Sequence, residues 1–215
     1  MVLSQRIVTL AAFILILLSA SACNSRDDEL ELAKSLLNEA TPMSRAEAVQ
    51  ILAPLAESGD AEAQLLVAIC FLEGWGVNRS RPEGIRWMRQ AAASGHPRAQ
   101  CAMGSLLVGN GGPRGVAEAV ELFVAAADQG ETEAMRHLAS MYEAGLGVPK
   151  DLGEALRLLL VAADQGDPQA QFLAAERIEQ GMGTSADLAE AERWYRLAAE
   201  QGHREAKQAL KRLGN

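Results

Sequence analysis

The sequence has few aromatic residues, few cysteines and few histidines, and each shortage excludes a class of protein. Aromatic residues make up 4% of the 215 positions, which disfavours a β-sandwich because strands prefer aromatic and β-branched side chains. Three cysteines and three histidines are too few for a scaffold held together by disulfides. Positive charge is also scarce. The net charge of −8 excludes a general nucleic-acid binder, which needs a basic face.

Apolar residues, and alanine above all, dominate the chain instead. Apolar residues make up 49% of the sequence and charged residues 22%, which excludes intrinsic disorder. An alanine-rich, aromatic-poor composition favours closely packed helices. The length allows one domain, or two small ones, with a sizeable core.

The first 22 residues are predicted to be a cleaved signal peptide. Arg6 precedes an uncharged apolar run over residues 7–18, which is too short for a membrane-spanning helix and typical of a leader. The small residues that follow lead to Cys23, and residues 18–23 resemble a bacterial lipobox, whose cysteine becomes the acylated N-terminus. The resemblance implies that Cys23 is a lipid anchor, and Asn24 points to the outer membrane. Plain secretion stays the alternative, because Ala20 stands where leucine is commoner.

Residues 23–43 are predicted to form an acidic tether and a capping helix. Cleavage before Cys23 would remove Arg6 and no acidic residue, which takes the net charge from −8 to −9. The leucines at positions 30, 32, 36 and 37 predict a helix from about residue 28 to 39 that closes the N-terminus of the region that follows.

From residue 44 the sequence repeats itself about every 36 residues. The repeat is marked by five glycines, each with an alanine four residues later: Gly59, Gly95, Gly130, Gly166 and Gly202. Small or apolar residues lie three and four positions before each glycine, and large apolar pairs lie seven and eight before it. These offsets predict one stripe of an α-helix before the glycine and a second helix after it. The predicted copies are 44–79, 80–114, 115–150, 151–186 and 187–215.

The ends of the predicted helices are also marked. Acceptable N-caps stand fifteen residues before the marker glycines, at Ser44, Ser80, Gly115, Asp151 and Asp187. A glutamate follows each of them by three residues, which predicts capping boxes rather than a metal site, because carboxylates in separate copies cannot converge on one ion. Each marker glycine is predicted to end the first helix in left-handed conformation. The next residue, which is a histidine at positions 96 and 203, then begins the second helix. Glycine pairs such as Gly145 and Gly147 are predicted to end the second helices.

The repeat pattern resembles that of Sel1-like repeats, which are relatives of tetratricopeptide repeats. The copies that match best are residues 191–202, with the Trp194-Tyr195 pair, and residues 142–148, with the Gly145-Leu-Gly147-Val exit. The resemblance covers residue 44 to about 213. It implies an all-α fold, a right-handed α-solenoid of about five helix–turn–helix repeats with an N-terminal capping helix. It also implies a scaffold for protein–protein contacts. The last copy departs from the pattern at Lys211, which suits a terminal cap with a polar outer face.

We expect no catalytic residue, cofactor, metal or small-molecule substrate, because we find no polar cluster that breaks the repeat. His137 is the one histidine away from a turn, and nothing in its own copy resembles a nucleophile. Cys70 and Cys101 lie on second helices of neighbouring copies, where core packing is the favoured interpretation and a disulfide between them stays open. Some Sel1-like proteins staple each hairpin with paired cysteines, but no copy here contains such a pair. Trp75, in a loop, is interpreted as a lid over its hairpin, with an exposed contact residue as the alternative.

The expected function is that of a membrane-tethered periplasmic adaptor, placed as an outer-membrane lipoprotein facing the periplasm. A secreted or soluble periplasmic protein is the alternative location, and a cell-wall-associated glycan-binding protein or hydrolase is the alternative function. Because first helices line the concave surface in tetratricopeptide relatives, their variable positions predict a protein- or peptide-binding face. Those positions carry Arg86, Arg89, Arg157, Arg193 and Arg196. Guanidinium groups suit an acidic peptide. The alternative is a solvated face that neutralises neighbouring glutamates.

Overall fold

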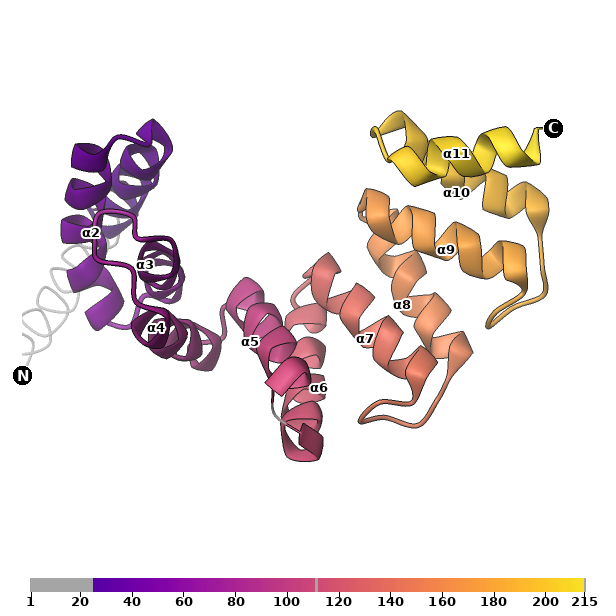
Figure 1. Cartoon of the computed structure of the whole chain (residues 1–215), viewed down its shortest axis with the longest axis horizontal. Coiled ribbons are helices and arrows are strands. Elements are labelled where there is room, and N and C mark those ends of the chain that lie inside the picture. The colour runs from indigo at the N-terminus through magenta and orange to yellow at the C-terminus, as the bar shows by residue number, and fades with distance from the viewer. Residues whose placement is uncertain (1–24, 111, 215) are drawn as a thin grey trace, which may run out of the picture. The chain divides into compact units, whose positions relative to one another are not determined.

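The computed structural model describes residues 25–110 and 112–214, and every secondary-structure element in these ranges is a helix (Figure 1). The prediction of an all-α fold made of helical hairpins is confirmed. The predicted leader and Cys23 lie outside the described residues. Among the helices of the described residues, none is long and apolar enough to span a membrane.

The chain divides into two compact units, residues 1–94 and residues 95–215. In the first unit, residues 25–39 are helical and are followed by α2 (Pro42–Glu57), α3 (Ala61–Glu73) and α4 (Arg81–Ala93). Helices that follow one another in the sequence pack together, α2 against α3 and α3 against α4.

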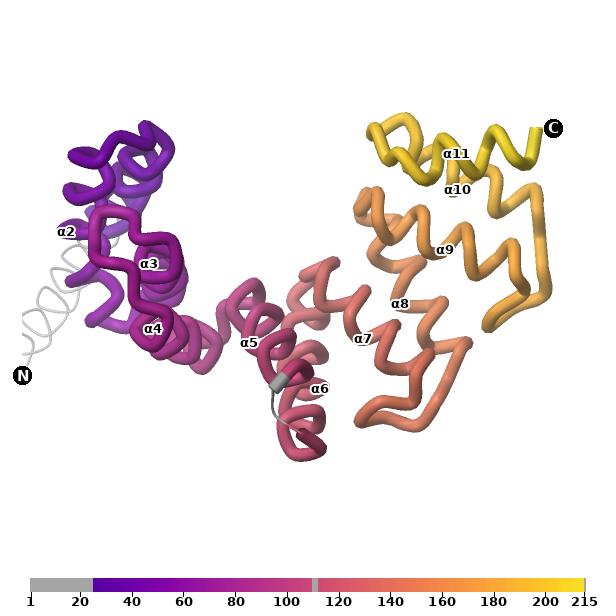
Figure 2. The backbone as a smooth tube through the Cα atoms, in the orientation of Figure 1, coloured from indigo at the N-terminus to yellow at the C-terminus, as the bar shows by residue number. Residues whose placement is uncertain are grey.

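The second unit continues the same pattern, and the tube in Figure 2 shows the chain reversing direction from one helix to the next. Each helix of this unit packs against the next one along the chain. The helices are α5 (Pro97–Asn110), α6 (Gly112–Asp128), α7 (Thr132–Ala144), α8 (Leu152–Asp164), α9 (Pro168–Gln180), α10 (Leu188–Glu200) and α11 (Arg204–Leu213).

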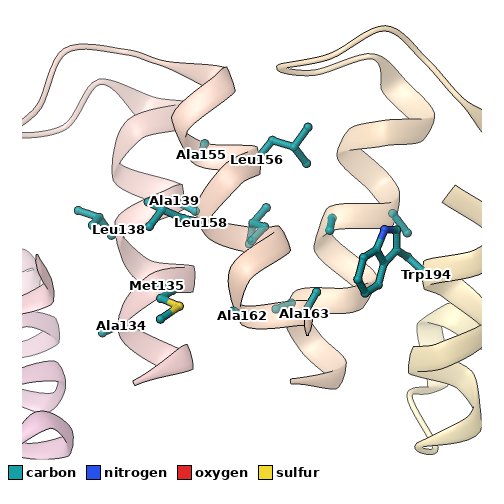
Figure 3. Close-up of a cluster of buried hydrophobic side chains, with 14 of the residues drawn as sticks. Ala134, Met135, Leu138, Ala139, Ala155, Leu156, Leu158, Ala162, Ala163 and Trp194 are labelled. Atoms are coloured by element: carbon teal, nitrogen blue, oxygen red, sulfur yellow. The ribbon is translucent and has the colours of Figure 1, made fainter. Parts of the chain in front are cut away.

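The alanine that follows each marker glycine lies in the core of its unit. All five of these alanines have no solvent-exposed surface, namely Ala63, Ala99, Ala134, Ala170 and Ala206. A methyl group at this position lets neighbouring helices approach closely, and larger apolar residues fill the space on either side. Figure 3 shows part of this core in the second unit, with Met135 and Leu138 from α7, Leu158 from α8 and Trp194 from α10. The predicted apolar stripe is therefore the packed face of each hairpin.

The marker glycines form the turn between the two helices of each hairpin, as predicted. All five have a positive φ between 88° and 96°, a conformation that side chains other than glycine rarely adopt. At Gly166, the backbone N–H of the glycine donates to the Ala163 carbonyl, and the N–H of Asp167 donates to the Ala162 carbonyl. This pair of hydrogen bonds is a Schellman motif, which satisfies carbonyls at the end of the first helix.

Three of the five predicted first-helix N-caps are confirmed in position, but the reciprocal capping boxes predicted there do not form, and the Ser80 side chain makes no capping bond. Ser80, Asp151 and Asp187 precede α4, α8 and α10, and both aspartates accept hydrogen bonds from backbone N–H groups of the first turn. The prediction of Ser44 is wrong, because Pro42 starts α2 earlier and Thr41 caps it through a reciprocal pair of bonds with Ser44.

The prediction of Gly115 as an N-cap is also wrong. α6 begins at Gly112, whose positive φ of 58° turns the chain after α5, and Gly115 is buried within the helix. A side chain at Gly115 would approach the Leu107 carbonyl oxygen within 3.1 Å. Glycine is therefore needed at this position for close packing against α5 rather than for capping.

The buried cysteines and Trp75 have structural roles. Cys70 and Cys101 are both free and buried, which confirms the interpretation as core residues, and burial raises the pKa of the Cys70 thiol to about 11. Trp75 packs against the core of the first unit, and the Arg45 guanidinium lies 4.5 Å from its ring centroid. Trp75 is therefore a lid over its hairpin.

Helices close both ends of the repeat region. Ala33 and Leu37, on the N-terminal helix, are buried in the core of the first unit, which confirms the predicted capping helix. At the other end, Ala206 is the one buried residue of α11, and Lys211 is exposed. The polar residue at Lys211 therefore lies on an exposed face of α11, as expected from its departure from the repeat pattern.

Candidate protein-binding surface

The predicted arginines are exposed on α4, α8 and α10, and four of them form ion pairs within their own helix. Arg157 binds Glu154 through two hydrogen bonds of 2.6 and 2.7 Å. The corresponding N···O distances are 2.8 Å from Arg86 to Glu83, 3.8 Å from Arg193 to Glu190 and 2.6 Å from Arg196 to Glu192. Arg89 is exposed and has no ion pair with any of the described residues.

Glutamates three or four residues away therefore neutralise most of this basic face. Exposed pairs of this kind contribute about 0–1 kcal/mol each, so a binding partner could displace them at little cost. Arg86 and Arg193 also lie over the rings of Trp87 and Trp194, at 4.6 and 4.8 Å. The arrangement fits the solvated face that was the alternative interpretation, and the role of these arginines in binding stays a prediction.

The second helices carry a more distinctive feature, an apolar cavity of about 180 Å³ in the second unit. α5, α6, α7 and the loop after α7 form its wall, which consists of Ser105, Val108, Phe123, His137, Ser140, Met141, Ala144 and Leu146. Val108 and Leu146 are 37% and 41% exposed, although both side chains are large and apolar. The cavity is large enough for one apolar side chain, and its serines could orient the adjoining backbone through hydrogen bonds.

A second, smaller cavity of about 110 Å³ lies beside the first and shares Ser140 with it. Two ion pairs between α7 and α9 flank this cavity. Arg177 binds Glu143 through bonds of 2.6 and 3.2 Å, and Arg136 binds Asp167 at 3.2 Å. An apolar cavity next to fixed charges is an arrangement that can distinguish one peptide sequence from another.

The same surface brings together Cys101, Glu133 and His137, which the sequence analysis did not connect. One ligand atom from each residue lies within 4.8 Å of the others. Burial, together with smaller effects of Glu133 and Glu131, raises the pKa of the Cys101 thiol to about 12. Burial lowers the pKa of His137 and outweighs the opposing effect of Glu133. The thiol is therefore protonated and the imidazole neutral near pH 7.

Helical hairpins that pack in series around buried alanines, with cavities on an exposed helix face, define a helical-repeat binding scaffold. The family model of the Sel1 repeat matches residues 61–96, 97–131, 132–167 and 168–203, so the chain belongs to the Sel1 repeat family. Members of this family are scaffolds for protein–protein interaction. Each matched segment starts at a second helix, half a repeat later than the copies defined from the N-caps.

Solved structures with the same fold include several bacterial proteins. A Sel1 repeat protein from Oxalobacter formigenes is 30% identical over 77% of this chain and 66% of its own, with a TM-score of 0.70. The antigen c5321 of uropathogenic Escherichia coli is 24% identical, over 90% of this chain and 50% of its own, with a TM-score of 0.69. The immunity protein Pa5087 of Pseudomonas aeruginosa is 21% identical over 85% and 68%, with a TM-score of 0.58.

The chain thus spans less than two thirds of the length of the first two of these proteins. No curated protein matches the sequence.

Proposed function

We propose that this chain is an adaptor of the cell envelope, which is tethered to the membrane through Cys23 and holds a protein or peptide partner on its second unit. Membership of a scaffold family supports the adaptor role. The location and the tether depend on the resemblance of residues 18–23 to a lipobox and on the apolar run before it.

The observation that carries the binding role is the apolar cavity between α5, α6 and α7. Val108 and Leu146 expose more than a third of their surface at its wall. The free energy of such exposure is unfavourable by about 25 cal/mol per Å² of apolar surface, and a partner that covers these side chains recovers it. The neighbouring ion pairs at Glu143 and Asp167 supply fixed polar groups for the rest of the partner.

Substitution at the cavity tests this role. Leu146→Asp places a charge at the wall, and partner capture by the detergent-solubilised full chain should be lost. Leu188→Asp is the matched control, because Leu188 is 58% exposed and lies at the start of α10, outside the cavity wall. Equal capture by both variants and the wild type would show that the cavity is not the binding surface.

The tether needs a separate test. Cys23→Ser should abolish labelling by a fatty-acid probe and release the protein from the membrane fraction, because acyl chains contribute about 0.8 kcal/mol per buried CH₂. Cys70→Ser should keep the label, since Cys70 is a buried core residue. A wild-type protein that never takes up the probe would refute the lipid anchor and leave the binding role untouched.

A further inference from the structure

We infer that Cys101, Glu133 and His137 form a binding site for Zn²⁺ or a chemically similar divalent metal ion, on the face of the second unit where α5 packs against α7. Among the described residues, this is the one group of three thiol, imidazole and carboxylate ligands that lie within 4.8 Å of one another. The inference is independent of the proposed partner, because the metal ion is a ligand in its own right.

The positions of the side chains are suited to coordination. Glu133 and His137 are one helical turn apart on α7, so both project from the same face of the helix. The Nε2 atom of His137 lies 3.8 Å from Glu133 Oε1 and 3.3 Å from the hydroxyl of Ser105. This atom therefore points toward the other groups, and the Ser105 hydroxyl places a fourth polar atom nearby.

The distances require only small side-chain movements. Zn–S and Zn–N bonds of about 2.3 and 2.0 Å in a tetrahedral site place neighbouring ligand atoms about 3.5 Å apart. Glu133 and His137 are 59% and 41% exposed, so their side chains can rotate inward, whereas Cys101 is 3% exposed and fixed in the core. Stacking of the His137 ring on Phe123, with centroids 5.0 Å apart, keeps the imidazole directed at this place.

The chemistry of the three ligands selects the metal. A thiolate with an imidazole suits Zn²⁺ and related ions, whereas Mg²⁺ and Ca²⁺ require oxygen ligands. The imidazole would donate the lone pair of a ring nitrogen to the metal. The thiol must lose its proton to the solvent when the sulfur–metal bond forms, and a bound metal ion is able to drive that deprotonation.

The site also has an accessible side. His137 and Ser105 are part of the wall of the apolar cavity, so a metal held by three protein ligands would face the cavity with its fourth position. Three protein ligands and one open position are the pattern of zinc sites that bind an exchangeable group.

The other copies show that different side chains can fill the places of Cys101 and His137. The positions equivalent to Cys101 in three other copies are Leu65, Arg136 and Phe172, and those equivalent to His137 are Leu66, Ala102 and Leu173. The fold therefore accepts apolar residues at both places, and the cysteine–histidine pair occurs at one junction between copies.

Cobalt titration of the full chain in detergent, under reducing conditions, tests the site. Co²⁺ should bind with one-to-one stoichiometry and give the near-ultraviolet band of sulfur-to-cobalt charge transfer together with visible bands of a four-coordinate ion, and Zn²⁺ should displace it. Cys101→Ala should remove the charge-transfer band. His137→Gln and Glu133→Gln, both at exposed positions that do not endanger folding, should each weaken binding about tenfold or more.

Cys70→Ala and Cys23→Ser are the matched controls, since they replace the other two cysteines of the chain. Both should bind Co²⁺ like the wild type. The inference is wrong if the wild type gives no charge-transfer band, if the band survives in Cys101→Ala, or if it disappears in either control. Because no partner is present in this assay, its result does not depend on the proposed adaptor role.

Discussion

Replacement of Gly183 by alanine should destabilise the second unit far more than the same change at Gly166. Both glycines have a positive φ, 81° at Gly183 and 91° at Gly166, so alanine is strained at either position by about 1–2 kcal/mol. The surroundings differ. A Cβ atom at Gly166 would meet nothing within 4 Å, whereas at Gly183 it would overlap the carbonyl oxygen of Leu152 and lie 2.7 Å from its carbonyl carbon.

The clash at Gly183 involves backbone, and this sets its magnitude. Leu152 is the first residue of α8, so its carbonyl group cannot move without shifting the start of that helix. Overpacking of this kind costs about 1–3 kcal/mol. The expected loss of unfolding free energy is therefore about 2–5 kcal/mol for Gly183→Ala and about 1–2 kcal/mol for Gly166→Ala.

Urea unfolding followed by circular dichroism measures both values. Gly147→Ala provides an intermediate case, because its Cβ would lie 2.7 Å from a side-chain methyl group of Val116, which can rotate away. The three glycines belong to one unit, so any departure from two-state unfolding in a repeat array affects them alike. Equal losses at Gly183 and Gly166 would refute the claim that the exit loop is pressed against α8.

Three further predictions concern the core, an acid-sensitive contact and the arginine face. Ala134→Trp should lower the unfolding free energy by about 1–3 kcal/mol, since Ala134 has no exposed surface; an unchanged thermal midpoint would contradict this. Burial tends to raise the pKa of Asp167, but the Ala170 N–H, Thr132 and Arg136 outweigh burial and lower the pKa. The stability that this shift contributes is present above the unfolded pKa of about 3.9 and is lost as the pH falls through the lower pKa of the folded state. Asp167→Asn should therefore make urea unfolding less sensitive to acid. An unaltered dependence of the unfolding free energy on pH would contradict this prediction. Charge reversal at four arginines should preserve helicity and abolish partner capture, and capture at the wild-type yield would show that this face is not a binding surface; these are Arg86, Arg89, Arg193 and Arg196.

The spacing of the repeated residues predicts the helices and turns of this protein, because the two helices of every copy pack together in the same way. The five marker glycines and the alanines after them recur at positions where a positive φ or a close helix contact leaves no other choice. Prediction from the repeat spacing is wrong where one copy differs from the others. The repeat spacing did not predict the Thr41–Ser44 cap or the early start of α6 at Gly112. A local proline in the first case, and a one-residue deletion in the second, shift the start of a helix without disturbing the core.

The cluster of Cys101, Glu133 and His137 could not be derived from any single copy. The cysteine belongs to α5 and the other two residues to α7, and their sequence offsets from the marker glycines differ. Only the packing of α5 against α7 makes them neighbours. The ion pairs of the arginine face were visible in the sequence, by contrast, because each arginine and its glutamate lie three or four residues apart on one helix.

A repeated hydrogen-bond pattern indicates why distinctive features gather on α7. In three copies a buried glutamine on the second helix binds the end of the next first helix: Ser94 donates to Gln64, Gln129 to Gln100 and Gln201 to Gln171. On α7 the equivalent position is Met135, which packs in the apolar core.

α7 packs against the next hairpin through the apolar core and also through two partly buried ion pairs, those of Arg136 with Asp167 and of Arg177 with Glu143. These pairs flank the smaller cavity, and α7 also contributes to the wall of the apolar cavity and supplies Glu133 and His137 to the cysteine–histidine cluster. Where the buried glutamine makes this hydrogen bond, the exposed face of the second helix is not needed to hold the next hairpin. Where ion pairs replace the glutamine hydrogen bond, that face of the helix carries charges in fixed positions. Charges in fixed positions allow a binding surface to discriminate between partners. We therefore expect specificity to reside in the copy that contains α7, where Met135 stands in place of the glutamine.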